Sequence, residues 1–299
     1  MSEWVAIALR FGVYLDLMLL FGLVAYPLHS VGRASSSSEH SRSLPLALAM
    51  LGIALSIASF IVMTASMAGV ALAGLDRETL AFVLQETGHG TAFMVQVFAL
   101  LATVALALLG RGARGGWLTV AAAGVALGSL AWTGHAGATE GLPGALHRLS
   151  DIVHLVAAAA WIGALAILLR TIAKTGAEVA EAQQALAAFA VVGSVIVGLI
   201  IVTGIVNSLM IVGVAGLPLL PFTLYGQLLI AKLALFALML MLAALNRWRL
   251  TPRLGLRRAS GEVPREMTEV RRSLVLEIGA AITILGLVAW LGLLAPPSP

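Results

Sequence analysis

The stretch HRLSDIVHLVAAAAWIGALAILLRTI, from His147 to Ile172, opens with polar residues and continues as an almost unbroken apolar run. A helix needs about 20 mostly apolar residues to cross the hydrocarbon core of a bilayer, and this stretch is long enough. Three ionisable side chains, His147, Asp151 and His154, nevertheless stand in its first turns. Such residues are costly inside a membrane. The stretch therefore predicts a membrane-spanning helix with a functional site at its front end.

The composition extends the membrane prediction to the rest of the chain. Of 299 residues, 60% are hydrophobic and 11% are charged, whereas a soluble domain has about 25% charged residues. The apolar runs that can span a bilayer cover roughly residues 4–28, 44–74, 90–110, 117–134, 147–172, 187–213, 223–248 and 271–295. We therefore predict an all-α polytopic protein, a bundle of about eight transmembrane helices that form a single transmembrane domain over residues 1–299.

The basic residues predict the orientation of the chain. Of the 18 Lys and Arg residues, 14 lie in the loops after the first, third, fifth and seventh runs, and two lie in the loops after the second, fourth and sixth. Cytoplasmic loops of membrane proteins carry such an excess. We therefore expect both termini outside. The bias also explains the sequence pI of about 10.1 without a nucleic-acid partner, so we expect the lipid bilayer as a partner and no nucleic acid.

The candidate metal ligands are expected to gather near the outer face. His147, Asp151 and His154 are spaced i, i+4, i+7 and share one helix face. The two histidines lie roughly 10 Å apart along the helix axis, so we expect one ion to bind Asp151 together with one of them. Further candidates at similar depth are the histidines His89 and His135 and the methionines Met63, Met67 and Met94.

The types of these side chains indicate which metal they suit. Imidazole and carboxylate suit Cu(II), Zn or Ni, and thioether suits Cu(I). The chain has no cysteine, which excludes thiolate metal sites and covalently attached haem. The alternative for the methionines is packing between helices, and for the histidines it is capping or loop hydrogen bonding.

Two further patterns concern the arrangement of the spans. Asp16 and Lys232 fall at similar depth in the first and seventh runs, so we expect an ion pair between them. Gly22 and Gly163 are separated by 141 residues, and so are Gly52 and Gly193. This spacing predicts a weak repeat of four helices, with residues 1–134 echoed by residues 147–295.

Several segments of the second half resemble a known family. They are GHA (134–136), HRLSDIVHLVAAAAWIGAL (147–165), VTGIVNSLMIVG (202–213), TLYGQLLIAKLALFALMLMLAALNRWRLTPRL (223–254) and RRSLVLEIGAAI (271–282). They resemble the CopD family of bacterial copper-resistance proteins, most strongly over about residues 130–295. The resemblance implies a multi-pass protein of the bacterial inner membrane, linked to copper uptake or tolerance and often found beside a periplasmic CopC-type copper carrier.

The resemblance also implies roles for individual residues. It marks His135, His147, Asp151 and His154 as handling a copper ion. It also places five further residues in the family pattern but assigns them no role: Asn207, Tyr225, Lys232, Asn246 and Glu277. Relatives often carry a histidine in the first span, where this chain has Tyr14 and Asp16.

Two functional hypotheses follow. The first is a protein without enzymatic activity that imports copper from the periplasm to the cytoplasm, for copper homeostasis or resistance. The sequence has no Walker A pattern, and the membrane potential favours cation entry by about 2.3 kcal/mol per charge per 100 mV. The alternative is a membrane redox protein that binds haem b between two axial histidines, with His154 paired to His89 or His135.

Overall fold

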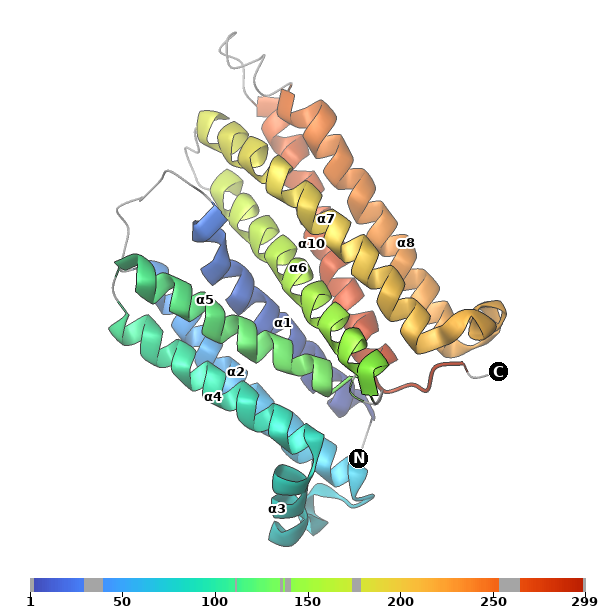
Figure 1. Cartoon of the computed structure of the whole chain (residues 1–299). Coiled ribbons are helices and arrows are strands. Elements are labelled where there is room, and N and C mark those ends of the chain that lie inside the picture. Colours follow the sequence, from blue (N-terminus) through green and yellow to red (C-terminus); the bar gives the residue numbers. More distant parts are fainter. Residues whose placement is uncertain are drawn as a thin grey trace.

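A computed structural model describes residues 3–29, 40–110, 112–134, 137, 141–173, 179–252 and 264–297. All regular structure in these ranges is helical. The elements are α1 (Glu3–His29), α2 (His40–Met67), η1 (Leu72–Gly74), α3 (Arg77–Glu86), α4 (Gly88–Leu109), α5 (Gly112–Gly128), η2 (Ser129–Trp132), α6 (Gly141–Ala173), α7 (Val179–Gly216), η4 (Leu217–Phe222), α8 (Leu224–Leu245), η5 (Asn246–Leu250) and α10 (Pro264–Leu291). Figure 1 shows them as one bundle.

Eight of the described helices are long and apolar enough to cross a membrane. This confirms the prediction of an all-α polytopic fold. The segments are α1, α2, α4, α5 with η2, α6, α7 with η4, α8 with η5, and α10. Each of them contains one of the predicted apolar runs or most of it.

The predicted end of the second span is wrong. The apolar run extends to residue 74, but α2 ends at Met67. Gly69 adopts a φ of +69°, a left-handed conformation through which a helix does not continue. The short helix α3 then begins directly after its N-cap residue Asp76, whose carboxylate accepts a hydrogen bond from the backbone N–H of Thr79 at 2.7 Å.

The two halves of the chain meet where α1 crosses α6. One apolar core joins α1 with α2, α4, α5 and the front of α6, and a second joins the rest of α6 with α7, α8 and α10. At the crossing, a Cβ atom added to Gly22 would lie 2.7 Å from the Cα of Gly163. Only glycine at both positions allows the two backbones to approach this closely.

This contact bears on the predicted repeat, because Gly22 and Gly163 are one of its two matched pairs. Equivalent residues next to a two-fold axis contact each other, and these two glycines do so. The second pair differs in its surroundings, since Gly52 packs against Asp16 and Leu100, whereas Gly193 packs against Phe189 of its own helix. The repeat stays a prediction.

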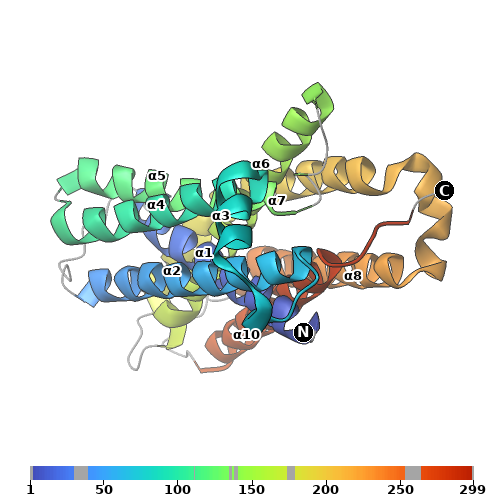
Figure 2. The ribbon, with the colours of Figure 1, turned by 90° about the horizontal axis from the view of Figure 1, so that it is seen from below.

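Both termini of the described chain lie at the same end of the bundle, next to α3 and the first turns of α6 (Figure 1). Figure 2 views the molecule from this end. Two helices that start here are capped by threonines, because Thr87 accepts a hydrogen bond from Gly90 N at the start of α4 and Thr223 accepts one from Gly226 N at the start of α8, both at 3.1 Å. The candidate site residues of α4 and α6 therefore lie toward the end that carries the termini.

Candidate functional site

Three predicted residues of α6, His147, Asp151 and His154, line one cavity of about 180 Å³. Because α6 begins at Gly141, all three lie inside the helix, several residues from its first turn. Neighbouring helices complete the wall, with Asn207 from α7 and Lys232 from α8. We call this space the α6 cavity.

The hydrogen bonds around His154 favour one of the two tautomers of its neutral ring. Its Nδ1 lies 2.9 Å from the hydroxyl oxygen of Thr203. That hydroxyl donates its own proton to the carbonyl of Leu199, at 2.5 Å, so it accepts from His154. This arrangement favours the neutral tautomer with its proton on Nδ1, in which Nε2 keeps a lone pair that can bind a metal.

Asp151 is the carboxylate closest in sequence to both histidines, and one of its oxygens is already engaged. The side-chain amide of Asn207 donates to Asp151 Oδ1 at 3.2 Å. The second oxygen makes no hydrogen bond within the described part of the chain and can accept a cation. Asn207 thus holds the carboxylate in place from the facing helix, and His147, 1% exposed, is packed one turn before it.

Two cationic side chains, Arg10 and Lys232, also line the α6 cavity. The expected ion pair between Asp16 and Lys232 is wrong. Both carboxylate oxygens of Asp16 are buried without a hydrogen-bond partner in the described ranges, and a Cβ atom added to Gly52 would lie 2.6 Å from Asp16 Oδ2. Lys232 instead lines the α6 cavity together with Asp151 and His154, because α8 packs on α10.

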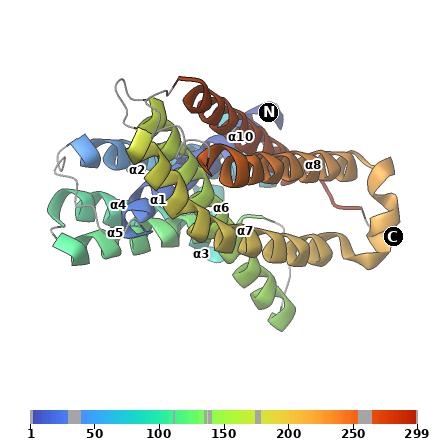
Figure 3. The same cartoon turned by 90° about the horizontal axis from the view of Figure 1, so that it is seen from above.

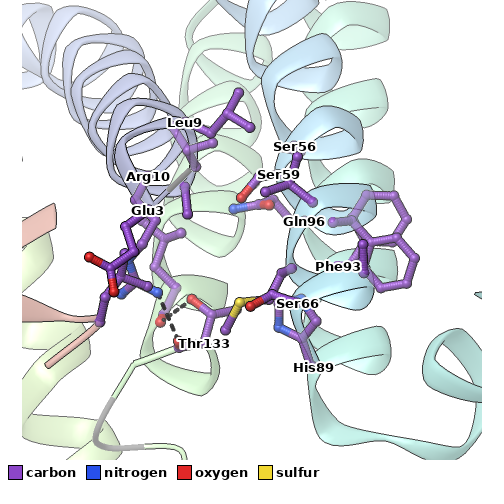
Figure 4. Close-up of a pocket in the computed structure, with 18 of the residues that line it drawn as sticks. Glu3, Leu9, Arg10, Ser56, Ser59, Ser66, His89, Phe93, Gln96 and Thr133 are labelled. Carbon is purple, nitrogen blue, oxygen red and sulfur yellow. Dashed lines mark hydrogen bonds between the residues drawn. The ribbon is translucent and has the colours of Figure 1, made fainter. Parts of the chain in front are cut away.

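His89 and Met63 line a different cavity, of about 480 Å³, between α1, α2 and α4 (Figure 4). The ring of His89 stacks on Phe60, with ring centroids 5.6 Å apart. The Nε2 atoms of His89 and Gln96 are buried there, and no described residue forms a hydrogen bond with either of them. We call this space the α4 cavity. Arg10 lines both cavities and donates to the carbonyl of Thr133 at 3.5 Å.

The structure thus divides the predicted ligand set instead of gathering it. Met67 is 55% exposed, and neither it nor Met94 lines one of the two cavities. His135 lies outside the described residues, directly after Gly134, which lines the α6 cavity. Among the described residues, no three His, Asp or Glu side chains are placed to hold one metal ion. The haem pair His154 and His89 is not formed either, since the two rings line separate cavities.

Sequence reasoning missed Thr203, and it named Asn207 without assigning its role in orienting the site. Thr203 and Asn207 lie one helical turn apart on α7 and face His154 and Asp151, which lie three residues apart on α6. The matching spacing of polar residues in two apolar helices is a signal that could have paired them. Ser150 adds a third contact at the same place, donating to the carbonyl of Thr203 at 3.4 Å.

Comparison with known proteins adds a family to this geometry. The family model for the copper resistance protein D-like N-terminal domain matches residues 1–145, and the model for copper resistance protein D matches residues 183–291. No solved structure matches the chain.

Two curated relatives are similar in sequence. Copper resistance protein D of Pseudomonas syringae pv. tomato is 38% identical over 307 residues, which covers 99% of this chain and 98% of that protein. Inner membrane protein YebZ of Escherichia coli K12 is 36% identical over 126 residues, 42% of each chain. A relative of such identity over nearly its full length, together with the two family models, shows that this multi-pass membrane protein belongs to the copper resistance protein D family.

Proposed function

We propose that this protein takes up a copper ion at the outer face of the bacterial inner membrane and passes it toward the cytoplasm. The ion is cargo, and the chain performs no catalysis. The observation that carries the proposal is the α6 cavity, where Nε2 of His154 keeps its lone pair beside a carboxylate that is held from one side only. Membership of a copper resistance family supports copper as the ion.

The α6 cavity can capture copper with few protein ligands. His154 supplies a neutral imidazole, and Asp151 supplies one oxygen, both of which suit Cu(II). His147 is one turn from Asp151 and can supply a second imidazole after a side-chain rotation. We propose His135 and a carrier protein as donors of the other ligands.

The α4 cavity offers a different set, an imidazole from His89 and a thioether from Met63, which suits Cu(I). Because Arg10 lies between the two cavities, its positive charge opposes direct passage of a cation from one to the other. We therefore assign copper uptake to the α6 cavity and regard the α4 cavity as a separate place of capture.

The inward direction is supported by energetics. A cation that moves from outside to inside is driven by the membrane potential, by about 2.3 kcal/mol per charge per 100 mV. We propose a periplasmic CopC-type carrier as the donor of the ion, since both cavities lie toward the end of the bundle that we expect to face the periplasm.

Transport into proteoliposomes tests this function. Purified protein is reconstituted in vesicles with copper outside, and a potassium gradient with valinomycin sets the interior negative. We expect copper to accumulate inside wild-type vesicles, to accumulate less when the potential is reversed, and to stay outside in vesicles with His154→Ala. Accumulation that equals that of protein-free vesicles would refute the transport function.

A further inference from the structure

A long apolar groove separates α7 from α8. The two helices have almost no close contacts with each other, because α7 packs on α6 and α8 packs on α10. Figure 3 shows them at the edge of the bundle, joined by η4 at one end. Two cavities lie along the gap, one of about 430 Å³ next to His154 and Lys232 and one of about 440 Å³ next to Asn246 and Arg247. Trp161 on α6 lines both. We call them together the α7–α8 groove.

The two ends of the groove differ in chemistry. The near end contains the polar side chains of His154 and Lys232. Between the two ends, the groove walls are almost entirely apolar, with residues such as Leu165, Val197 and Phe236. At the far end, Arg247 donates a hydrogen bond to Ser194, and the neighbouring Trp248 is 71% exposed. A cation beside an exposed tryptophan at the end of a membrane span is typical of the headgroup region of a bilayer.

Two buried polar atoms in the same part of the groove lack partners. Nε1 of Trp161 is a donor and Oδ1 of Asn246 is an acceptor, and neither has a hydrogen-bond partner among the residues that the structure describes. Both side chains are more than nine-tenths buried, so each missing bond costs about 1–3 kcal/mol. The carboxylate of Glu277 is already engaged, because it accepts from Asn246 Nδ2 at 2.5 Å and from Ser273 at 3.4 Å. A ligand of this groove therefore needs an apolar body and a polar, anionic head.

We propose that the α7–α8 groove binds one anionic phospholipid, with its phosphate at Arg247 and one acyl chain running along the groove toward His154. An ester carbonyl can accept from Trp161, and a headgroup hydroxyl can donate to Asn246. From Arg247 to Lys232 along α8 the rise is about 22 Å, enough for an acyl chain, since one leaflet contributes roughly half of a 30 Å hydrocarbon core.

The bound chain would complete the α6 cavity. His154, Gly204 and Lys232 line both the α6 cavity and the groove, so the polar site opens sideways toward the bilayer. An acyl chain in the groove closes this opening with hydrocarbon and keeps water and headgroups away from Nε2 of His154. This consequence rests on the proposed copper function, whereas the lipid site itself does not.

Native mass spectrometry of the copper-free protein in mild detergent tests the proposal. We expect one phosphatidylglycerol per chain to remain bound to the wild-type protein, and added phosphatidylcholine not to replace it. Arg247→Ala should weaken retention about tenfold, the loss of one hydrogen bond to a charged group. Arg249→Ala is the matched control, because Arg249 is exposed, lies two residues after Arg247 and does not line the groove, and this variant should retain the lipid.

A second variant keeps the test independent of charge and folding. Ala243→Trp adds bulk to the groove wall and should expel the lipid while Arg247 stays in place. Three results would overturn the proposal: a wild-type protein without bound lipid, equal retention of phosphatidylcholine, or equal losses in Arg247→Ala and Arg249→Ala. A second protein chain bound in place of lipid would overturn it as well. Because no copper is present, the outcome is independent of copper transport.

Discussion

The hydroxyl of Thr203 favours one tautomer of His154, so it supports the proposed copper site without being a ligand. In Thr203→Val the shape of the side chain is kept, but Nδ1 of His154 loses its acceptor. We expect copper affinity to fall about 10- to 100-fold, the usual cost of losing an outer-shell partner. Isothermal titration with copper measures it, and Thr203→Ser should restore the affinity. Equal affinities in Thr203→Val and wild type would show that the hydroxyl has no such role.

Lys232 places a positive charge in the cavity that is proposed to receive a cation. Removing this charge in Lys232→Met should strengthen copper binding, by about tenfold for an interaction of about 1.4 kcal/mol at the effective dielectric constant of a protein. Lys232→Arg keeps the charge and should leave the affinity low. Competition with a copper chelator gives the affinity of each variant, and a weaker affinity in Lys232→Met than in Lys232→Arg would contradict the account.

The candidate residues could be predicted from the sequence where one helix carries them, and not where several helices must meet. His147, Asp151 and His154 share a face because their spacing matches the helix repeat, so their common cavity was predictable. The grouping of His89 and Met63 apart from them depends on the position of α1, which places Arg10 between the two cavities. The partner of Lys232 likewise depends on helix packing, which no single apolar run encodes.

Hydropathy was sufficient to predict that the eight helices exist and that each is long enough to span a membrane, because a span is determined by its length and apolarity alone. The end of α2 was misjudged for a local reason, since the residues after Gly69 are as apolar as the helix but the chain turns there. The close crossing of α1 and α6 was visible only as a pair of glycines with a regular spacing. Only the structure shows that the backbones of Gly22 and Gly163 are in contact.

The α1–α6 crossing yields a prediction about stability. A leucine in place of Gly163 must overlap the backbone of Gly22, and overpacking of this kind costs about 1–3 kcal/mol or more. Thermal unfolding in detergent should therefore show a clear drop in Tm for Gly163→Leu. Gly198→Leu is the control, because a Cβ atom there meets nothing within 4 Å. A Tm equal to that of the control would mean that the two helices can separate without cost.

The arrangement of the molecule as a whole predicts its topology. Both described chain ends lie at one end of the bundle. The loops rich in Lys and Arg connect the spans at the opposite end of the bundle. Tags fused to either terminus should be accessible to a membrane-impermeant reagent from outside intact cells, and a tag inserted after Ser260 only after the cytoplasm is opened. A terminus accessible only from the cytoplasm would place both cavities on the wrong side for uptake from the periplasm.

The most direct test of the account is the amount of copper that the purified protein retains, measured for wild type and single histidine variants with zinc as competitor. We expect His154→Ala to lose most of the bound copper while it stays folded, and His147→Ala to lose part of it. We expect His29→Ala and His40→Ala, on the side opposite to the site in the predicted topology, to retain all of it. Binding to a neutral imidazole also implies that retention falls as the pH is lowered, because protons compete with the metal for the ring nitrogen. If His154→Ala and His147→Ala both keep full copper stoichiometry and affinity, the α6 cavity is not the copper site.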